Sequence, residues 1–159
     1  MSEQLGKVDH SSLRVNQALI ILGLLVSFIF NFPWLVAAVA LVMLLGTAIG
    51  RPGFFPVYTM LLRPLRIVKP HILADNPEPH RFAQGFGGVV AAIAAALLLL
   101  GASVAGWALS WLVIALAAAN LFLGFCAGCA VYYWMHRLQV PGFLKSPPAG
   151  TFPGMRPRS

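Results

Sequence analysis

The sequence predicts an all-α integral membrane protein in which four transmembrane helices form two hairpins. Three observations support this fold class. The chain is 59% apolar and only 9% charged, whereas an average soluble domain is about 45–50% apolar and about 25% charged. Its charged residues fall in three segments, and the two stretches between these segments carry none. Both stretches are apolar and longer than one membrane-spanning helix of about 20 residues.

The first uncharged stretch, residues 15–50, predicts the first hairpin. Its 36 residues suit two helices of minimal length, since one span needs about 20 residues. The stretch is interrupted near its middle by Pro33, which favours a turn, and by Trp34, which favours the membrane interface. We therefore expect helices near 15–32 and 34–50.

The segment that follows, residues 51–81, predicts an irregular connector outside the membrane core. It contains six prolines and five Lys or Arg residues. Prolines interrupt regular helices, and clustered cations next to membrane helices interact with anionic lipid headgroups. We expect this connector to lie on the headgroups at the cytoplasmic surface.

The second uncharged stretch, residues 82–136, predicts the second hairpin. Its 55 residues again exceed one span of about 20 residues. Two glycines and a serine interrupt it at 101–107, where the segment ends in a tryptophan. We expect helices near 82–103 and 107–135, which are long enough to tilt in the bilayer or to extend beyond it.

The positions of the charges also predict the orientation. Two hairpins return the chain twice to its starting side, so all fifteen charged residues lie on one face. The net charge is +7, and an excess of Lys and Arg marks the cytoplasmic side. We expect both termini in the cytoplasm, one membrane domain over residues 1–140, and a disordered basic Pro/Gly tail over 141–159. Nucleic acid is not an expected partner, because basic patches with interleaved aromatic residues are missing.

A short polar motif occurs at the start of each predicted hairpin. Arg14 and Gln17 open the first hairpin, and Arg81 and Gln84 open the second with the same spacing. One copy per hairpin is consistent with a parallel internal repeat about an axis along the membrane normal. Each arginine can reach lipid phosphates while its glutamine lies one turn deeper on the same helix face. Two interpretations remain: hydrogen bonding between the hairpins through the glutamines, or simple anchoring at the interface.

Small residues mark where the second hairpin is expected to pack closely. On the fourth predicted helix, Asn120, Gly124 and Gly128 fall within about 100° of one another. Gly85 and Gly88 lie near the cytoplasmic end of the third predicted helix. Small residues let membrane helices approach one another, so we expect Gly124 and Gly128 to pack near Gly85 and Gly88.

The cysteine pair of the fourth predicted helix is the main candidate for chemistry. Cys126 and Cys129 form a C-x-x-C motif, and with Tyr133 and His136 they fall within about 80° on one helix face. Cysteines at this spacing on a helix can lie within disulfide range. We expect a redox pair inside the membrane, below its cytoplasmic surface, with Tyr133 and His136 orienting or deprotonating the thiols. The alternative is that both cysteines only fill apolar space.

Several other kinds of site are not predicted. The chain has no second cysteine pair for a four-thiolate zinc site, and nothing in the sequence places His10, His71 or His80 beside the thiols, so no metal site is expected. Two cysteines also make no disulfide framework. The sequence has no phosphate-binding loop, no serine–histidine–aspartate set and no carboxylate within the apolar stretches. The sequence therefore does not predict a kinase, a hydrolase or a carboxylate-driven proton pump.

Four motifs occur together over most of residues 8–138. They are V-D at 8–9, R-V-N-Q at 14–17, P-H-R-F-A-Q at 79–84, and G-F-C-A-G-C at 124–129 with Asn120 and Tyr132 nearby. This combination resembles bacterial domain-of-unknown-function family 4395. The resemblance implies an integral protein of the bacterial cytoplasmic membrane without a settled activity.

The resemblance also implies sulfur or thiol chemistry at Cys126 and Cys129. Members of the family often occur beside thioredoxin-like and sulfurtransferase proteins, which suggests partners of these kinds. The family usually has proline or a small residue at the position of His80. The resemblance therefore assigns no shared role to His80.

Three functions from different classes fit these residues. The first is thiol–disulfide or sulfur-handling redox chemistry, in which Cys129 exchanges with a soluble thioredoxin-like or sulfurtransferase partner and Cys126 resolves the product. No resident cofactor is expected for it, and a membrane quinone is the acceptor considered. The second is a carrier of a soft metal ion or a small sulfur anion, bound by the thiolates. The third is a structural subunit of an oligomer or larger membrane complex, docked through its glycine faces.

Overall fold

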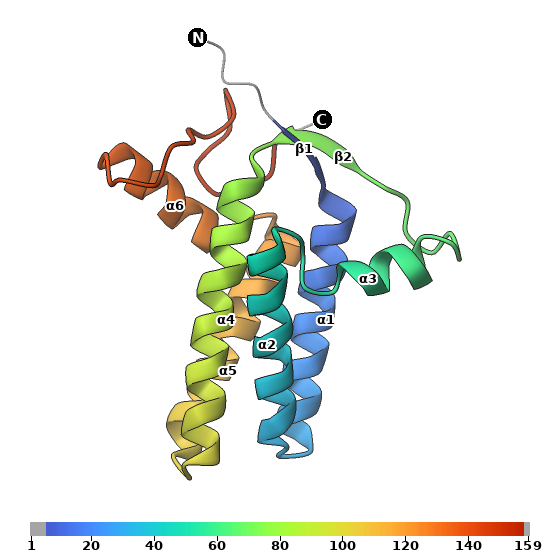
Figure 1. Ribbon diagram of the computed structural model, residues 1–159, viewed down its shortest axis with the longest axis vertical. Helices are drawn as coiled ribbons and strands as arrows, with labels where there is room; N and C mark the ends of the chain where they lie inside the picture. Colours follow the sequence, from blue (N-terminus) through green and yellow to red (C-terminus); the bar gives the residue numbers. More distant parts are fainter. Residues whose placement is uncertain (1–5, 158–159) are drawn as a thin grey trace.

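The computed structural model describes residues 6–157 and is mostly helical. Four long helices run side by side, and the shorter elements gather at one end of them as a broader region, here called the head (Figure 1). The long helices are α1 (His10–Ile29), α2 (Pro33–Ile49), α4 (Pro77–Leu99) and α5 (Ser103–Ala118). The shorter elements are β1 (Gly6–Asp9), α3 (Phe55–Val57), β2 (Ile72–Asp75) and α6 (Ala127–Arg137). Of these, α3 projects to one side of the bundle.

Both predicted hairpin turns are present. α1 and α2 are joined through Asn31, which has a positive φ of 47°, and α2 begins at Pro33. α4 and α5 are joined through Gly101, whose φ of 87° is a left-handed conformation that glycine adopts without strain. α4 packs against α2 and α5, and α1 packs against the same two helices. The two hairpins therefore form one bundle.

All four long helices begin earlier than predicted: α1 and α4 by five residues, α5 by four, and α2 by one. α1 begins at His10 because the carboxylate of Asp9 accepts a hydrogen bond from the backbone N–H of Ser11 (3.0 Å) and so caps the helix. α4 begins at Pro77, whose fixed φ suits the first helical position. The sequence interpretation ended each span at the nearest charge, and it therefore missed these polar first turns.

The predicted fourth helix, near 107–135, is interrupted, which corrects the sequence interpretation. α5 gives way to a single π-helical turn over Ala119–Leu123, and Gly124 then adopts a left-handed φ of 67° before α6 begins. A left-handed residue ends a helix, and glycine is the residue that does so most easily. A projection at 100° per residue holds only for a continuous helix, so Asn120, Gly124 and Gly128 do not share one helical face.

The glycine contacts also differ from those expected. Gly128 does pack against α4, but at Ala83, whose Cβ would lie 2.5 Å from a Cβ placed on Gly128. Gly85 and Gly88 face α2 instead of α6. A Cβ placed on Gly124 would lie 3.6 Å from Arg156 Cβ and would contact no atom of α4. The small residues of α4 therefore serve the contact with the first hairpin.

We expect Gly128→Ala to lower the stability of the detergent-purified protein. The new Cβ would lie 2.5 Å from Ala83 Cβ and 2.7 Å from its Cα, so α4 or α6 must shift. Such overpacking costs about 1–3 kcal/mol. Gly87→Ala is the matched control, because its Cβ would meet only the flexible end of Met43 at 3.0 Å. Thermal unfolding should show a lower midpoint for Gly128→Ala alone, and equal midpoints would contradict the packing of α6 on α4.

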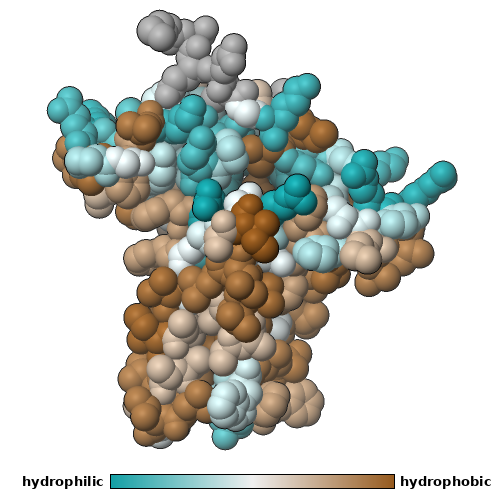
Figure 2. All heavy atoms as spheres, in the orientation of Figure 1, coloured by the Kyte–Doolittle hydropathy of each residue, from teal (hydrophilic) through white to brown (hydrophobic). Residues whose placement is uncertain are grey.

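The bundle has the length and surface of a membrane-spanning unit. Three helical segments are long and apolar enough to cross a membrane, namely His10–Ile29, Pro77–Leu99 and Ser103–Leu123, and α2 is apolar but shorter. Figure 2 shows an apolar surface over the bundle and a hydrophilic surface over the head. Side chains at the α4–α5 turn are strongly exposed, for example Leu100 (83%) and Val104 (88%). Lipid contact accounts for so broad an apolar surface.

Two expectations stay predictions: that α2 also spans the membrane, and that all charged residues lie on one side of it. Glu3 and Arg158 lie outside the described residues. We expect topology reporters fused after Asn31 and after Ala102 to lie on the outer face of the membrane, because each follows the first helix of a hairpin whose charged ends are cytoplasmic. A cytoplasmic signal at either position would contradict the model of two membrane hairpins.

The head is held together by pairing between segments that are distant in sequence. β1 and β2 pair in antiparallel fashion, with Asp9 opposite Ile72. This places a short strand inside the connector, which the sequence predicts to be irregular. Near the end of the chain, Phe125 pairs with Met155 in an isolated bridge. The predicted tail 141–159 is therefore in contact with the start of α6, and the disorder of the tail stays a prediction.

Candidate functional site

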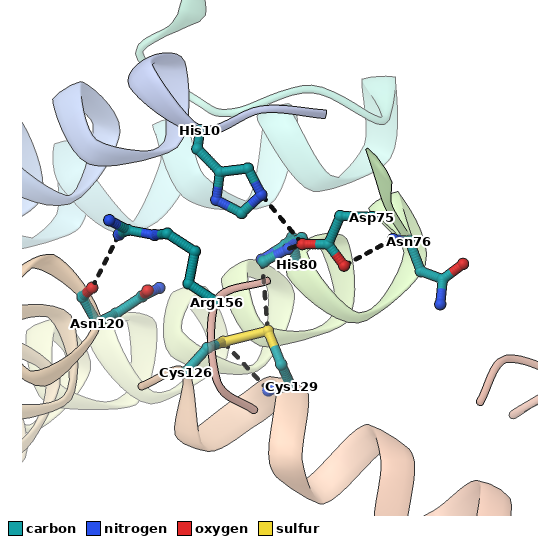
Figure 3. Close-up of a disulfide and its surroundings, with 8 residues drawn as sticks. All are labelled: His10, Asp75, Asn76, His80, Asn120, Cys126, Cys129 and Arg156. Carbon is teal, nitrogen blue, oxygen red and sulfur yellow. Dashed lines mark hydrogen bonds and ion pairs between the residues drawn. A yellow bond between two sulfur atoms is a disulfide. The ribbon is translucent and has the colours of Figure 1, made fainter. Parts of the chain in front are cut away.

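The two cysteines form a disulfide bond at the N-terminus of α6 (Figure 3). Cys126 is the N-cap residue, and its sulfur accepts a hydrogen bond from the backbone N–H of Cys129 (3.2 Å). Both residues are buried, at 5% and 2% exposure. The N-terminus of a helix favours negative charge. A reduced Cys126 at this position is therefore stabilised as the thiolate, which is the reactive form of cysteine.

His80 lies beside the disulfide, which corrects the expectation that no other histidine is near the thiols. Its Nδ1 is 3.4 Å from Cys129 Sγ. The residue belongs to the first turn of α4, which begins at Pro77 and packs against α6. The extra turn at the start of α4 is therefore what places the imidazole next to the sulfur.

A buried carboxylate, Asp75, contacts the other side of the imidazole. Its Oδ2 is 2.8 Å from His80 Nε2 and 3.1 Å from His10 Nε2, and its Oδ1 accepts a hydrogen bond from the backbone N–H of Asn76 (2.8 Å). The contact with His10 is not aligned as a hydrogen bond. Burial alone would raise the pKa of Asp75, but the contacts with His10, His80 and the Asn76 N–H hold it well below its usual range. Asp75 is therefore ionised at neutral pH.

Sulfur, imidazole and carboxylate form a continuous row from α6 through α4 to the end of β2 (Figure 3). Because Asp75 accepts at Nε2, we assign the proton of neutral His80 to that nitrogen, which leaves Nδ1 as an acceptor toward Cys129. A histidine oriented in this way can take a proton from a thiol. The arrangement can therefore activate Cys129 as a thiolate.

The two support residues expected from the sequence are placed differently from each other. Tyr133 is buried and lines the same cavity as both cysteines. Burial raises its pKa to about 12, although a hydrogen bond with Asn76 acts in the opposite direction. Tyr133 therefore stays protonated at neutral pH and is no base. His136 lies 2.8 Å (Nδ1) from the carbonyl oxygen of Phe143 and does not line that cavity.

The motif glutamine Gln84 connects the two hairpins, but its partner is Asn16 instead of Gln17. Asn16 Nδ2 donates to Gln84 Oε1 (3.1 Å). Arg81 Nε donates to the carbonyl oxygen of Thr47 (2.6 Å), close to the end of α2. These polar contacts join α1, α2 and α4, so the second copy of the motif has a structural role. Gln17 lines the cavity that contains the cysteines.

A polar cavity in the head reaches the disulfide. It encloses about 430 Å³ including its open mouth, and both cysteines line it together with His80. Arg14 and Arg156 line it as well. Burial, and then the charge of Arg14, lowers the pKa of Arg156, yet a guanidinium group stays charged in proteins. Two cations at a cavity with few carboxylates favour an anionic ligand.

Sequence reasoning missed four residues of this site, which are His10, Asp75, His80 and Arg156. His10 and Asp75 meet because β1 pairs with β2, and no motif links them. Arg156 reaches the site because the backbone N–H of Arg156 donates to the carbonyl oxygen of Gly124 (2.9 Å). The one sequence feature that pointed to His80 is its position just before the third predicted helix.

Comparison with known proteins gives one match. A family model described as Domain of unknown function (DUF4395) matches residues 8–137, a range that includes all long helices and the cysteine pair. No curated protein and no solved structure matches the chain.

Proposed function

The chain belongs to the family Domain of unknown function (DUF4395), and we propose that it is a membrane thiol–disulfide oxidoreductase with Cys126 and Cys129 as its reactive pair. One observation carries the proposal: the pair caps a helix and contacts a histidine that a buried carboxylate orients. Cysteines that only fill apolar space need neither of these partners. Strongly oriented titratable groups of this kind gather at functional sites.

In the first step, a donor thiolate enters the polar cavity and attacks Cys129 Sγ. A bond forms between the donor sulfur and Cys129, and the bond between the two cysteines breaks. Cys126 leaves as a thiolate, which the helix N-terminus and the Cys129 N–H stabilise. A better-stabilised thiolate leaves faster, so attack at Cys129 is favoured over attack at Cys126.

In the second step, a second donor thiolate attacks the donor sulfur of the mixed disulfide. The donor leaves as a disulfide, and Cys129 leaves as a thiolate that takes a proton through His80. Two electrons have then passed from the donor to the pair. We propose a soluble thioredoxin-like or sulfurtransferase protein on the cytoplasmic side as the natural donor, because a protein thiolate or persulfide matches the cationic cavity.

We expect the rate of reduction of the pair to depend on the charge of the donor. Two small thiols test this: 2-mercaptoethanesulfonate is anionic and 2-mercaptoethanol is neutral. Replacing both Arg14 and Arg156 with glutamine should lower the rate ratio of the anionic to the neutral thiol by about tenfold. Arg63→Gln, outside the cavity, is the control.

The measurement is the reduced fraction of the pair with time, read by alkylation and intact mass. A ratio that is the same in the double variant and in Arg63→Gln would contradict the anionic-donor assignment. Failure of both thiols to reduce the pair in the unmodified protein would contradict the oxidoreductase itself.

A second candidate function is binding of a soft metal ion. The ligand atoms of His80, Cys126 and Cys129 all lie within 4.8 Å of one another. Two thiolates and an imidazole are the ligands that zinc and copper(I) prefer, and Asp75 would orient the imidazole from behind. Metal binding of this kind requires the reduced cysteines. Tight zinc binding by the reduced protein, together with a disulfide that thiol reagents cannot reduce again once it has formed, would favour metal binding over redox exchange.

A further inference from the structure

We propose that a second, apolar cavity binds a lipid-soluble quinone, which accepts the two electrons of the reduced cysteine pair. This inference rests on the proposed oxidoreductase function and adds the chemical class of the electron acceptor. It is carried by the position of the cavity, which has Cys126 at one end and the apolar surface of the bundle at the other.

The cavity lies between α1, α4 and α5. It encloses about 790 Å³, a figure that includes its open mouth. Most of its lining is apolar, from residues such as Ile20, Met43, Val90, Val113 and Ala117. An apolar ring with a hydrocarbon tail fits this lining, and a water-soluble acceptor does not.

The mouth of the cavity opens toward lipid. The lining side chains that are most exposed are Phe86 (56%), Leu112 (47%) and Leu116 (39%). They belong to α4 and α5, two of the candidate membrane spans. A ligand that enters between these helices therefore comes from the bilayer, where quinones are dissolved.

The inner end of the cavity is polar and contains the reactive groups. Cys126 and His80 line it, as do the amide side chains of Gln17 and Asn120. Amide N–H groups can donate hydrogen bonds to quinone carbonyl oxygens. The polar cavity of the head is lined by both cysteines, whereas the apolar cavity is lined by Cys126 and not by Cys129. Cys129 therefore lies on the donor cavity alone, and Cys126 lies between the donor cavity and the acceptor cavity.

This geometry gives a balanced transfer. The Cys126 thiolate adds to the quinone ring, and Cys129, deprotonated by His80, attacks Cys126 Sγ. The disulfide forms, the bond between sulfur and the ring breaks, and its electron pair stays on the ring. One proton comes from Cys129 through His80, and the other is the proton lost when the Cys126 thiol ionised. In sum, a dithiol and a quinone give a disulfide and a quinol.

The test uses the full-length protein in quinone-free lipid nanodiscs, with the pair reduced by dithiothreitol and the reductant removed. Decylubiquinone or the water-soluble oxidant diamide is then added, and disulfide formation is followed by alkylation and intact mass. Absorbance reports the loss of quinone. We expect one quinone to be consumed per disulfide formed.

Two variants localise the reaction. Leu116→Trp fills the cavity, and Leu45→Trp places the same side chain on α2, where Leu45 is exposed (51%) and does not line the cavity. The ratio of the quinone rate to the diamide rate should fall by at least about tenfold in Leu116→Trp and stay at the unmodified value in Leu45→Trp.

The outcomes separate the two proposals. Oxidation of the pair by diamide but not by quinone overturns the quinone site, leaves the oxidoreductase standing, and assigns the cavity to a lipid acyl chain. Equal quinone-to-diamide ratios in the two tryptophan variants also overturn the site. A pair that reacts with neither oxidant overturns the oxidoreductase and the quinone site together.

Discussion

Cys129→Ser should strongly slow exchange with any thiol donor, whereas Cys126→Ser should accumulate a stable mixed disulfide at Cys129. The difference follows from the positions of the two sulfurs. Cys129 lies beside His80 (3.4 Å to Nδ1) and lines the polar cavity only, whereas Cys126 lines both cavities. We therefore propose Cys129 as the sulfur that the donor attacks. Cys126 caps α6, and we propose it as the leaving group. Without it, nothing within the pair resolves the adduct.

The measurement is the intact mass of each variant after incubation with oxidised glutathione. Cys126→Ser should gain one glutathione readily, and Cys129→Ser should gain it much more slowly. The double variant with alanine at both positions is the control for labelling elsewhere, since the chain has two cysteines in all. Labelling of Cys129→Ser in preference to Cys126→Ser would reverse the assigned roles.

The second large effect is expected at His80. His80→Gln keeps a polar side chain but removes the base, and general-base catalysis contributes about 10²- to 10⁴-fold to a rate. We expect a loss in this range for re-formation of the disulfide from the reduced pair at neutral pH, because that is the step in which His80 takes the proton of Cys129. Asp75→Asn should cause a smaller loss, because His80 stays but loses the ionised partner that orients it (2.8 Å).

The pH profile separates this role from a merely structural one. The loss in His80→Gln should shrink as the pH approaches the usual thiol pKa of about 8.5, since thiols then ionise without a base. Thermal unfolding of both variants is measured in parallel. A rate loss that is the same at every pH would contradict the role of His80 as a base.

The four long helices and the two turns between them could be predicted from the sequence because their cause is local. Charged residues are costly inside a bilayer, so the uncharged stretches mark the helices, and Pro33 and Gly101 lie at the observed turns. The three-residue spacing of Arg81 and Gln84 was also informative, although Gln84 bonds to Asn16. The cysteine pair could be found for the same reason, since C-x-x-C is a local motif.

The rest depends on contacts between distant segments. One residue, Gly124, changes the direction of the chain, and its left-handed φ of 67° turns an assumed intramembrane helix face into a helix N-terminus. The pairing of β1 with β2 brings Asp75 to the start of α1, where it meets His10. Neither event leaves a periodic pattern in the sequence. The sulfur–imidazole–carboxylate row therefore became visible only in three dimensions.

The most direct test of the central claim is the redox state of Cys126 and Cys129 in native membranes. Cells are quenched in acid, free thiols are alkylated with a mass tag, and the oxidised and reduced fractions are read from the intact protein. The account predicts a pair that is oxidised in aerated cells, becomes reduced after dithiothreitol, and re-forms the disulfide when the reductant is removed. Thiols that stay reduced under diamide and resist permeant alkylating agents, with no phenotype for the double alanine variant, would contradict it. The cysteines would then be core residues, and a structural subunit of a membrane complex would be the better account.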